Sequence, residues 1–263
     1  MKKLFLIVLL LWMGGCSKVP ITGRNQITLV SNSEILALSQ QNYKEVLKES
    51  KLSNDADKVA QLRKIGNKIS AAVEEYLKSK GKGEILQGYK WEFNLIESEQ
   101  QNAWAMPGGK VAFYTGILPV CKNEDGIAVV MSHEIAHAIA QHGNERMSQQ
   151  MVAQGLGTAL DVALANQSSQ TRSAAMAAFG AGAQVGVLLP YSRKQESEAD
   201  ILGLYFMAMA GYNLDEAPEF WKRMAGSGGQ APPEILSTHP SNETRIKQME
   251  ENIPKAREYA KTH

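Results

Sequence analysis

The chain has 263 residues and is almost balanced in charge, with 28 lysines and arginines against 27 aspartates and glutamates. This balance gives no reason to expect nucleic acid or an anionic membrane surface as a partner. The length is enough for one large domain or two small ones.

The N-terminus resembles a bacterial lipoprotein signal. Two lysines precede an apolar run at residues 4–13, which is too short to span a bilayer as a helix and has the length of a signal-peptide core. Gly14, Gly15 and Cys16 follow this run, so cleavage would leave a lipid-modified Cys16, although Met13 stands where leucine is usual. Several acyl chains would anchor the protein stably to a membrane. A plain secretory signal with a chance cysteine is the alternative.

We therefore expect a signal peptide at residues 1–15, a lipid-anchored tether at 16–32 and a single domain at 33–263. Ser17 follows the cysteine, and by resemblance to enteric sorting this implies the outer membrane, facing the periplasm. Once that cysteine is acylated, one other cysteine remains, so an internal disulfide is impossible.

The first half of the domain combines helices with a small sheet. Helices are predicted at residues 33–50 and 55–80, and alternating side chains predict a strand at 89–97. Residues 102–116, NAWAMPGGKVAFYTG, are predicted to form a hairpin that turns at Pro-Gly-Gly. We expect these strands to form an antiparallel sheet. Apolar residues recur at spacings of three and four in the second helix: Val59, Leu62, Ile65, Ile69, Val73 and Leu77.

The second half is predicted to be helical from residue 124 onward. Residues 144–190 are rich in alanine, glycine, serine and glutamine. Their longest charge-free run has about fifteen residues, short of the roughly twenty that span a bilayer. We therefore expect packed or partly mobile helices here, and no membrane-spanning helix after the signal. Further helices are predicted at residues 192–211, 213–224 and 242–259, which makes the fold class α+β and mainly helical.

Three of the five histidines lie in VVMSHEIAHAIAQH, residues 129–142. His133 and His137 are four residues apart, so on a helix they share a face and can bind one zinc ion. Glu134 can reach a water that the zinc activates, as the general base of a metalloprotease. The flanking residues are apolar nearly all round, so the alternative, a buried helix with histidines in its core, leaves costly polar groups without a partner.

A catalytic zinc needs a third protein ligand and an open position for water. His142, His239 and the acidic residues of a later helix are candidates. A third histidine does not follow His137 at the HxxGxxH spacing, and His142, five residues on, would point to another face. This pattern disfavours the metzincin class and favours a glutamate ligand.

The stretch YSRKQESEAD, residues 191–200, resembles the SRxxExxxAD stretch of the metallopeptidase family that contains the CAAX prenyl protease and the heat-shock protease HtpX. It is most like the soluble or lipoprotein members and the mitochondrial OMA protease domain. The resemblance implies a zincin-type fold in which Glu196 is the third zinc ligand and Asp200 orients a ligating histidine. Glu198 is the rival ligand, but it points about 200° around the helix from Glu196.

Two further stretches resemble the same family, so that the resemblance covers about residues 102–246. STHPSNETRI, at 237–246, resembles its HPxxxxR element, which implies that His239 donates a hydrogen bond to the transition-state oxyanion and that Arg245 supports the site. Without the resemblance, His239 is a turn residue before Pro240. The hairpin resembles the strand beside the cleft, which can bind an extended peptide; its residues are Asn102, Ala103, Trp104, Ala105 and Met106.

The resemblance implies a zinc metalloendopeptidase with one Zn²⁺ per chain, lipid-anchored in the bacterial cell envelope and acting on unfolded or misassembled envelope proteins. The alternative is an envelope protein-binding or assembly factor on a peptidase fold, with little proteolysis. Intact ligands and an intact base argue against that alternative, because a pure binder needs neither. A third possibility is a latent enzyme whose cleft is covered by residues 144–190 and 225–233 until a substrate or partner displaces them.

Overall fold

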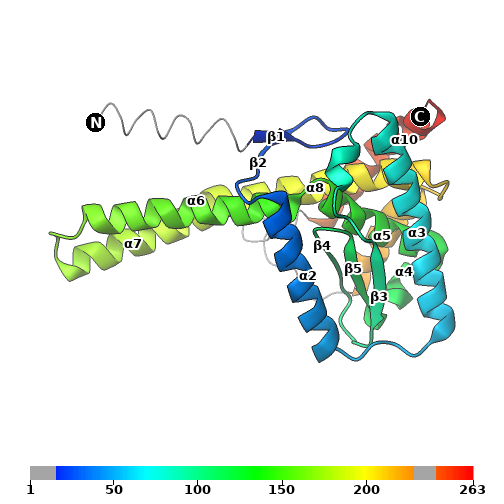
Figure 1. Cartoon of the computed structure of the whole chain (residues 1–263), viewed down its shortest axis with the longest axis horizontal. Helices are drawn as coiled ribbons and strands as arrows, with labels where there is room; N and C mark the ends of the chain where they lie inside the picture. Colours follow the sequence, from blue (N-terminus) through cyan, green and yellow to red (C-terminus); the bar gives the residue numbers. More distant parts are fainter. Residues whose placement is uncertain (1–15, 228–240, 263) are drawn as a thin grey trace.

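The computed structural model describes residues 16–227 and 241–262, so the predicted signal peptide lies outside the described part. The longer helices cover most of that part, as Figure 1 shows; they are α2 (Asn32–Glu49), α3 (Ala56–Ser79), α5 (Glu124–Ile139), α6 (His142–Ala163), α7 (Ser169–Ala183), α8 (Leu189–Met209), α9 (Glu216–Ser227) and α10 (Asn242–Lys261). The strands are β1 (Cys16–Lys18), β2 (Asn25–Ile27), β3 (Glu92–Ile96), β4 (Ala103–Met106) and β5 (Lys110–Tyr114). The short elements are η1 (Gly83–Leu86), η2 (Thr115–Ile117), α4 (Leu118–Cys121) and the π-helical η3 (Gln184–Leu188). The prediction of a mainly helical α+β fold is confirmed.

The main sheet has three strands in the order β3-β5-β4. The predicted hairpin joins β4 to β5, and Gly108 and Gly109 in its turn have φ values of 83° and 81°, which glycine adopts without strain. The prediction of an antiparallel sheet is wrong for β3, which runs parallel to β5. Alternating side chains indicate which face each residue occupies, but they carry no information about the direction of the neighbouring strand.

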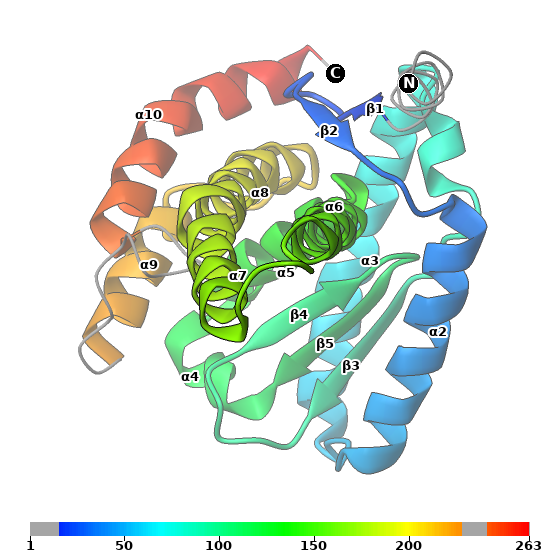
Figure 2. The same ribbon diagram turned by 90° about the vertical axis from the view of Figure 1, so that its left-hand side faces the viewer.

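Helix α5 lies at the centre of the core, where it contacts α3, α8 and strand β4. Figure 2 shows α3 behind the sheet and α2 along its side. The apolar stripe predicted for α3 faces this core, because Leu62, Ile65, Ile69, Val73 and Leu77 are all buried. The surroundings of α5 explain why its sequence is apolar on nearly every side.

The start of α5 is set by a tight connection from α4. The side chain of Asn123 caps the helix by accepting a hydrogen bond from the backbone N–H of Gly126. A Cβ atom on Gly126 would lie 1.9 Å from the carbonyl oxygen of Cys121. The residue must therefore be glycine if α5 is to begin where it does.

We expect Gly126→Ala to lower the free energy of unfolding by about 1–3 kcal/mol, because the backbone of α4 or α5 must move to admit the methyl group. Gly155→Ala is the matched control: this glycine lies inside α6 with open space where a Cβ would stand. Alanine there should raise stability by about 0.5–1 kcal/mol. Urea titrations of both variants measure the difference, and equal midpoints would contradict the close approach.

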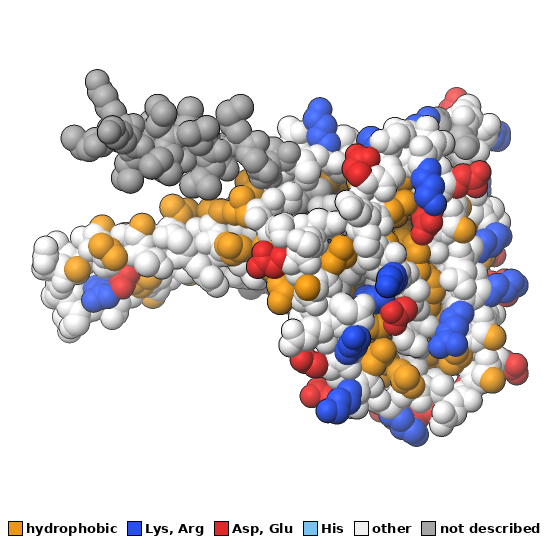
Figure 3. Space-filling view, in the orientation of Figure 1, with side chains coloured by type: hydrophobic (Ala, Val, Ile, Leu, Met, Phe, Trp, Pro, Cys, Tyr) orange, Lys and Arg blue, Asp and Glu red, His pale blue; other side chains and the backbone are white. Residues whose placement is uncertain are grey.

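Helices α6 and α7 and the start of α8 form an arm that projects from the core, as Figure 1 shows. Helices α6 and α7 contact each other, but the arm leaves apolar side chains exposed (Figure 3): Met151, Val152, Leu156, Val162, Val185 and Val187. Within the described residues, one helix, Ser169–Met209, is long and apolar enough to cross a membrane, and almost none of its most apolar stretch is buried. The expectation that such a helix is lacking is therefore corrected: α7, η3 and α8 run on as one helix of 41 residues, past the ends of the charge-free run.

Candidate active site

Helices α5 and α8 bring three metal-binding side chains together, those of His133, His137 and Glu196. The two histidine Nε2 atoms lie 3.1 Å apart, and the Glu196 carboxylate oxygens lie 3.4 Å from Nε2 of His133 and 3.2 Å from Nε2 of His137. Ligand atoms held about 2.0–2.1 Å from a tetrahedral zinc lie about 3.3 Å from one another. The spacing and the nitrogen and oxygen ligands therefore fit zinc.

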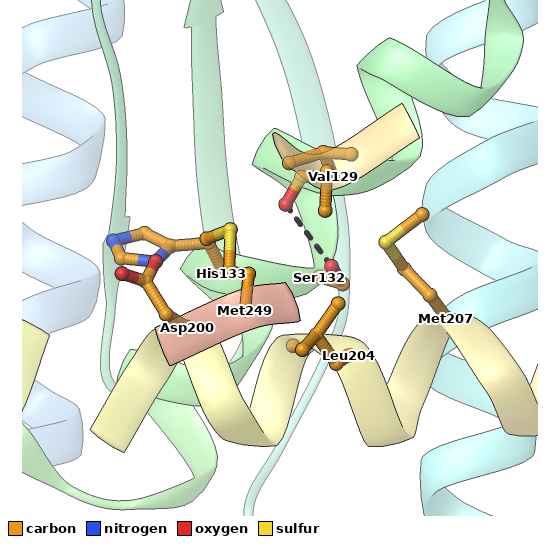
Figure 4. Close-up of a pocket in the computed structure, with 9 residues that line it drawn as sticks. Val129, Ser132, His133, Asp200, Leu204, Met207 and Met249 are labelled. Atoms are coloured by element: carbon orange, nitrogen blue, oxygen red, sulfur yellow. Dashed lines mark hydrogen bonds and ion pairs between the residues drawn. The ribbon is translucent and has the colours of Figure 1, made fainter. Parts of the chain in front are cut away.

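His133 is held in position from its other ring nitrogen. Asp200, one turn after Glu196 on α8, lies 2.9 Å from Nδ1 of His133, so that Nδ1 donates to the carboxylate and Nε2 points toward Glu196. Figure 4 shows the His133 ring and the Asp200 carboxylate directed toward each other. Arg245 of α10 donates to both Asp200 oxygens, at 2.7 and 2.6 Å, and its guanidinium stacks 3.4 Å above the Trp221 ring.

His137 is also held from its other nitrogen, by a pair of residues whose arrangement the sequence did not predict. Nδ1 of His142 lies 2.8 Å from Nδ1 of His137, and Nε2 of His142 lies 3.0 Å from the Glu198 carboxylate. Helix α5 ends at Ile139 and Gln141 adopts a left-handed conformation, so His142 starts a new helix and turns back toward His137. One signal for this pair is present in the sequence, because Glu196 and Glu198 are two residues apart and point to different sides of α8. Glu198 contacts His142 and is not one of the three metal-binding side chains.

The two ligating histidines have opposite pKa shifts. Burial alone disfavours a charged imidazole, but hydrogen bonds to Asp200 and Glu196 raise the pKa of His133 to about 10. Burial lowers the pKa of His137 to about 3. At neutral pH the metal-free protein therefore carries a proton on His133 and none on His137, and zinc must displace the proton of His133.

This asymmetry predicts that zinc binding at pH 8 releases about one proton per chain, the proton of His133. Because the raised pKa stabilises the protonated form, the apparent zinc affinity should rise about tenfold per pH unit between pH 7.5 and 9. Titration calorimetry in buffers of different ionisation enthalpy measures the released proton. An affinity that is flat over this range would contradict the assignment.

Glu134 lies between the two histidines on α5 and is suited to accept a proton. Burial raises the pKa of its carboxyl to about 7, so the group exchanges a proton near neutral pH.

The small cavity drawn in Figure 4, beside His133 and Asp200, has a volume of about 10 Å³. It holds a single water molecule at most and is not a substrate pocket.

Strand β4 forms one edge of the sheet and contacts α5. It contains four of the five residues predicted for the peptide-binding strand, and the fifth, Asn102, directly precedes it. All four strand residues are partly exposed: Ala103, Trp104, Ala105 and Met106. An edge strand beside the histidine helix has unpaired backbone groups that an extended peptide can use.

The other residues that the sequence analysis singled out are His239 and the two cysteines, Cys16 and Cys121. His239 lies outside the described residues, so its role stays a prediction. Cys16 is the first residue of β1, where its backbone pairs with that of Ile27. Cys121 is buried and has a free thiol.

Comparisons with known proteins agree with the geometry. The peptidase family M48 matches residues 65–253. The mitochondrial metalloendopeptidase OMA1 of Saccharomyces cerevisiae is 33% identical, over 95% of this chain and 75% of that protein, and its Schizosaccharomyces pombe counterpart is 34% identical, over 90% and 66%. The β-barrel assembly-enhancing protease of Escherichia coli is 31% identical over 59% of this chain, which spans about a third of that protein. The family match covers most of the chain, including all three candidate ligands, and the chain therefore belongs to peptidase family M48 and is a metalloprotease.

Proposed function

We propose that the chain is a zinc-dependent endopeptidase of the bacterial cell envelope, with His133, His137 and Glu196 as the zinc ligands. The observation that carries the proposal is the convergence of these three side chains from α5 and α8. Two further contacts support it, because Asp200 and His142 each occupy Nδ1 of one histidine and leave Nε2 for the metal.

The chemistry follows from the residues around this point. A zinc ion held by these three side chains would supply the Lewis acidity that activates water and polarises the peptide carbonyl. Glu134 takes the proton from the attacking water and passes it to the departing amine, which suits a carboxyl whose pKa burial has raised to about 7. Under this proposal, His239 donates a hydrogen bond to the oxyanion. Asp200 and Arg245 hold His133 in its orientation.

The proposed substrates are unfolded or misassembled envelope proteins. Strand β4 supports this choice, since its edge can pair with the backbone of any extended segment and thus reads little of the side-chain sequence. A folded protein offers few such segments. We expect zinc-loaded enzyme to cleave a reduced, unfolded protein and to leave the same protein intact when it is folded; equal cleavage of both would contradict the proposed substrate class.

We propose that the protein is attached to the outer membrane, on its periplasmic side, through acylated Cys16. The exposed apolar side chains of the arm formed by α6 and α7 support a position at a membrane. Growth with labelled palmitate of cells that express the wild type or Cys16→Ser tests the anchor: the labelled acyl group should be present in the wild type alone. An unlabelled wild type after growth with labelled palmitate would contradict it.

An assembly factor is the second candidate, because one relative is named a β-barrel assembly-enhancing protease. Such a factor would assist other envelope proteins by binding them. It would do so without the proton transfer at Glu134, and this difference makes the two functions separable by experiment.

A further inference from the structure

The hairpin of β1 and β2 contacts Glu198, a residue of α8 beside the candidate zinc site that lies far along the chain from the hairpin. In the turn between these strands, Thr22 donates a hydrogen bond to one oxygen of Glu198. Arg24 donates from Nε to the other oxygen of Glu198, at 2.8 Å. Glu198 is the residue that holds His142, so two residues, Glu198 and His142, connect the hairpin to the proposed zinc ligand His137.

Arg24 joins two buried carboxylates. Besides Glu198, it donates two hydrogen bonds at 2.7 Å to the two oxygens of Glu145 on α6, in the paired geometry that binds a guanidinium to a carboxylate most strongly. The Glu145 and Glu198 side chains are 2% and 6% exposed, so neither carboxylate is satisfied by bulk water. Gln195 adds a hydrogen bond to Glu145 at 2.7 Å. Arg24 is therefore the cation that allows both carboxylates to lie at the junction of α6 and α8.

The direction of each hydrogen bond along this chain follows from the groups that make it. A carboxylate only accepts, so the nitrogen of His142 that faces Glu198, Nε2, carries its proton. The other nitrogen of the neutral ring, Nδ1, then accepts from the Nδ1–H of His137. His137 is left with the lone pair of Nε2 pointing toward Glu196, which is the form that binds a metal.

We propose that Arg24 and Thr22 are positioning residues for the zinc ligand His137, acting through Glu198 and His142. The metal site is then built partly from the first strands after the predicted lipid anchor. The inference rests on the proposed zinc site. It adds that an element outside the helices of that site determines how strongly the site binds its metal.

The test compares Arg24→Met with Arg172→Met in the full chain, purified in detergent. Arg172 also pairs with a carboxylate, that of Asp161, but on the exposed arm. Competition with a chelator gives the zinc affinity, and the visible absorption of the Co²⁺-substituted protein reports the geometry of the ligands. We expect Arg24→Met to bind zinc about 10–100-fold more weakly than the wild type and to have an altered Co²⁺ spectrum. Arg172→Met should match the wild type in both, and Arg24→Lys, which keeps a cation, should regain part of the affinity.

A zinc affinity of Arg24→Met within twofold of that of Arg172→Met, with an unchanged Co²⁺ spectrum, would overturn the inference even if Arg24→Met were less stable, because the hairpin would then serve only to hold the fold together. If Arg24→Met does not fold, Thr22→Val decides, since this exposed threonine contributes one hydrogen bond to Glu198. A several-fold weaker zinc affinity supports the inference, and an unchanged one overturns it. A wild type that binds no zinc would overturn the proposed function itself, and the two failures are thus distinguishable.

Discussion

Replacing Glu134 with glutamine should lower the rate of peptide-bond cleavage by about 10²–10⁴-fold while zinc stays bound. The amide has nearly the shape of the carboxylate but cannot accept the proton of the attacking water. The three proposed ligands are untouched by this change, so one zinc per chain should remain. Cleavage of an unfolded protein substrate and elemental analysis of the same preparation measure both quantities.

Glu258→Gln is the control, because this glutamate is exposed on α10. It should keep both zinc and activity. Full activity of Glu134→Gln would refute the assignment of the base. Preserved assistance to envelope protein assembly in cells that carry Glu134→Gln would favour the assembly factor, since that function needs no proton transfer.

The second large effect is expected on stability. Arg245→Met should lower the free energy of unfolding of the metal-free protein by about 2–5 kcal/mol, because the buried Asp200 loses both guanidinium hydrogen bonds and keeps only the protonated His133 as a cationic partner. Arg245 is 3% exposed and donates to both oxygens of Asp200, and its guanidinium stacks on Trp221. Urea titration of the metal-free protein measures the loss.

Arg257→Met is the matched control on the same helix, since Arg257 pairs with Asp215 and both side chains are at least half exposed. Water replaces the partner of an exposed charge, so this variant should differ little from the wild type. Equal losses of unfolding free energy in the two variants would show that burial of the Arg245–Asp200 pair does not determine its contribution to stability.

The central part of the fold follows from sequence patterns that have a direct physical cause. The apolar residues of α3 recur at helical spacing because one side of that helix faces the core. The sequence HEIAH requires a helix to bring His133 and His137 to one point, and the all-round apolar flanks require that helix to be buried. The Pro-Gly-Gly turn likewise predicts the hairpin, because both glycines adopt positive φ.

The sequence patterns do not predict contacts between segments that are far apart in the chain. His142 follows His137 by five residues. This spacing places His142 on another face only if the helix continues, and here α5 ends at Ile139. The contact of Arg24 with Glu198 joins residues 174 positions apart, and the sequence around neither residue predicts it. In the same way, the parallel pairing of β3 with β5 depends on where the chain passes between them.

The projecting arm illustrates a different limit. Its charge-free run is too short to span a bilayer, so the sequence predicts packed or partly mobile helices and no membrane-spanning helix. The helix nevertheless continues through η3 into α8, and its apolar residues remain exposed. Composition alone does not tell which surface an alanine- and glycine-rich helix will face.

The most direct test of the account is the zinc content of the wild type beside Glu196→Ala, with Glu258→Ala as control, after dialysis against a small excess of zinc. The three-ligand site predicts one zinc per chain in the wild type and the control, and a loss of bound zinc in Glu196→Ala. A wild type without zinc, or a Glu196→Ala variant that keeps one zinc per chain with unchanged affinity, would contradict it.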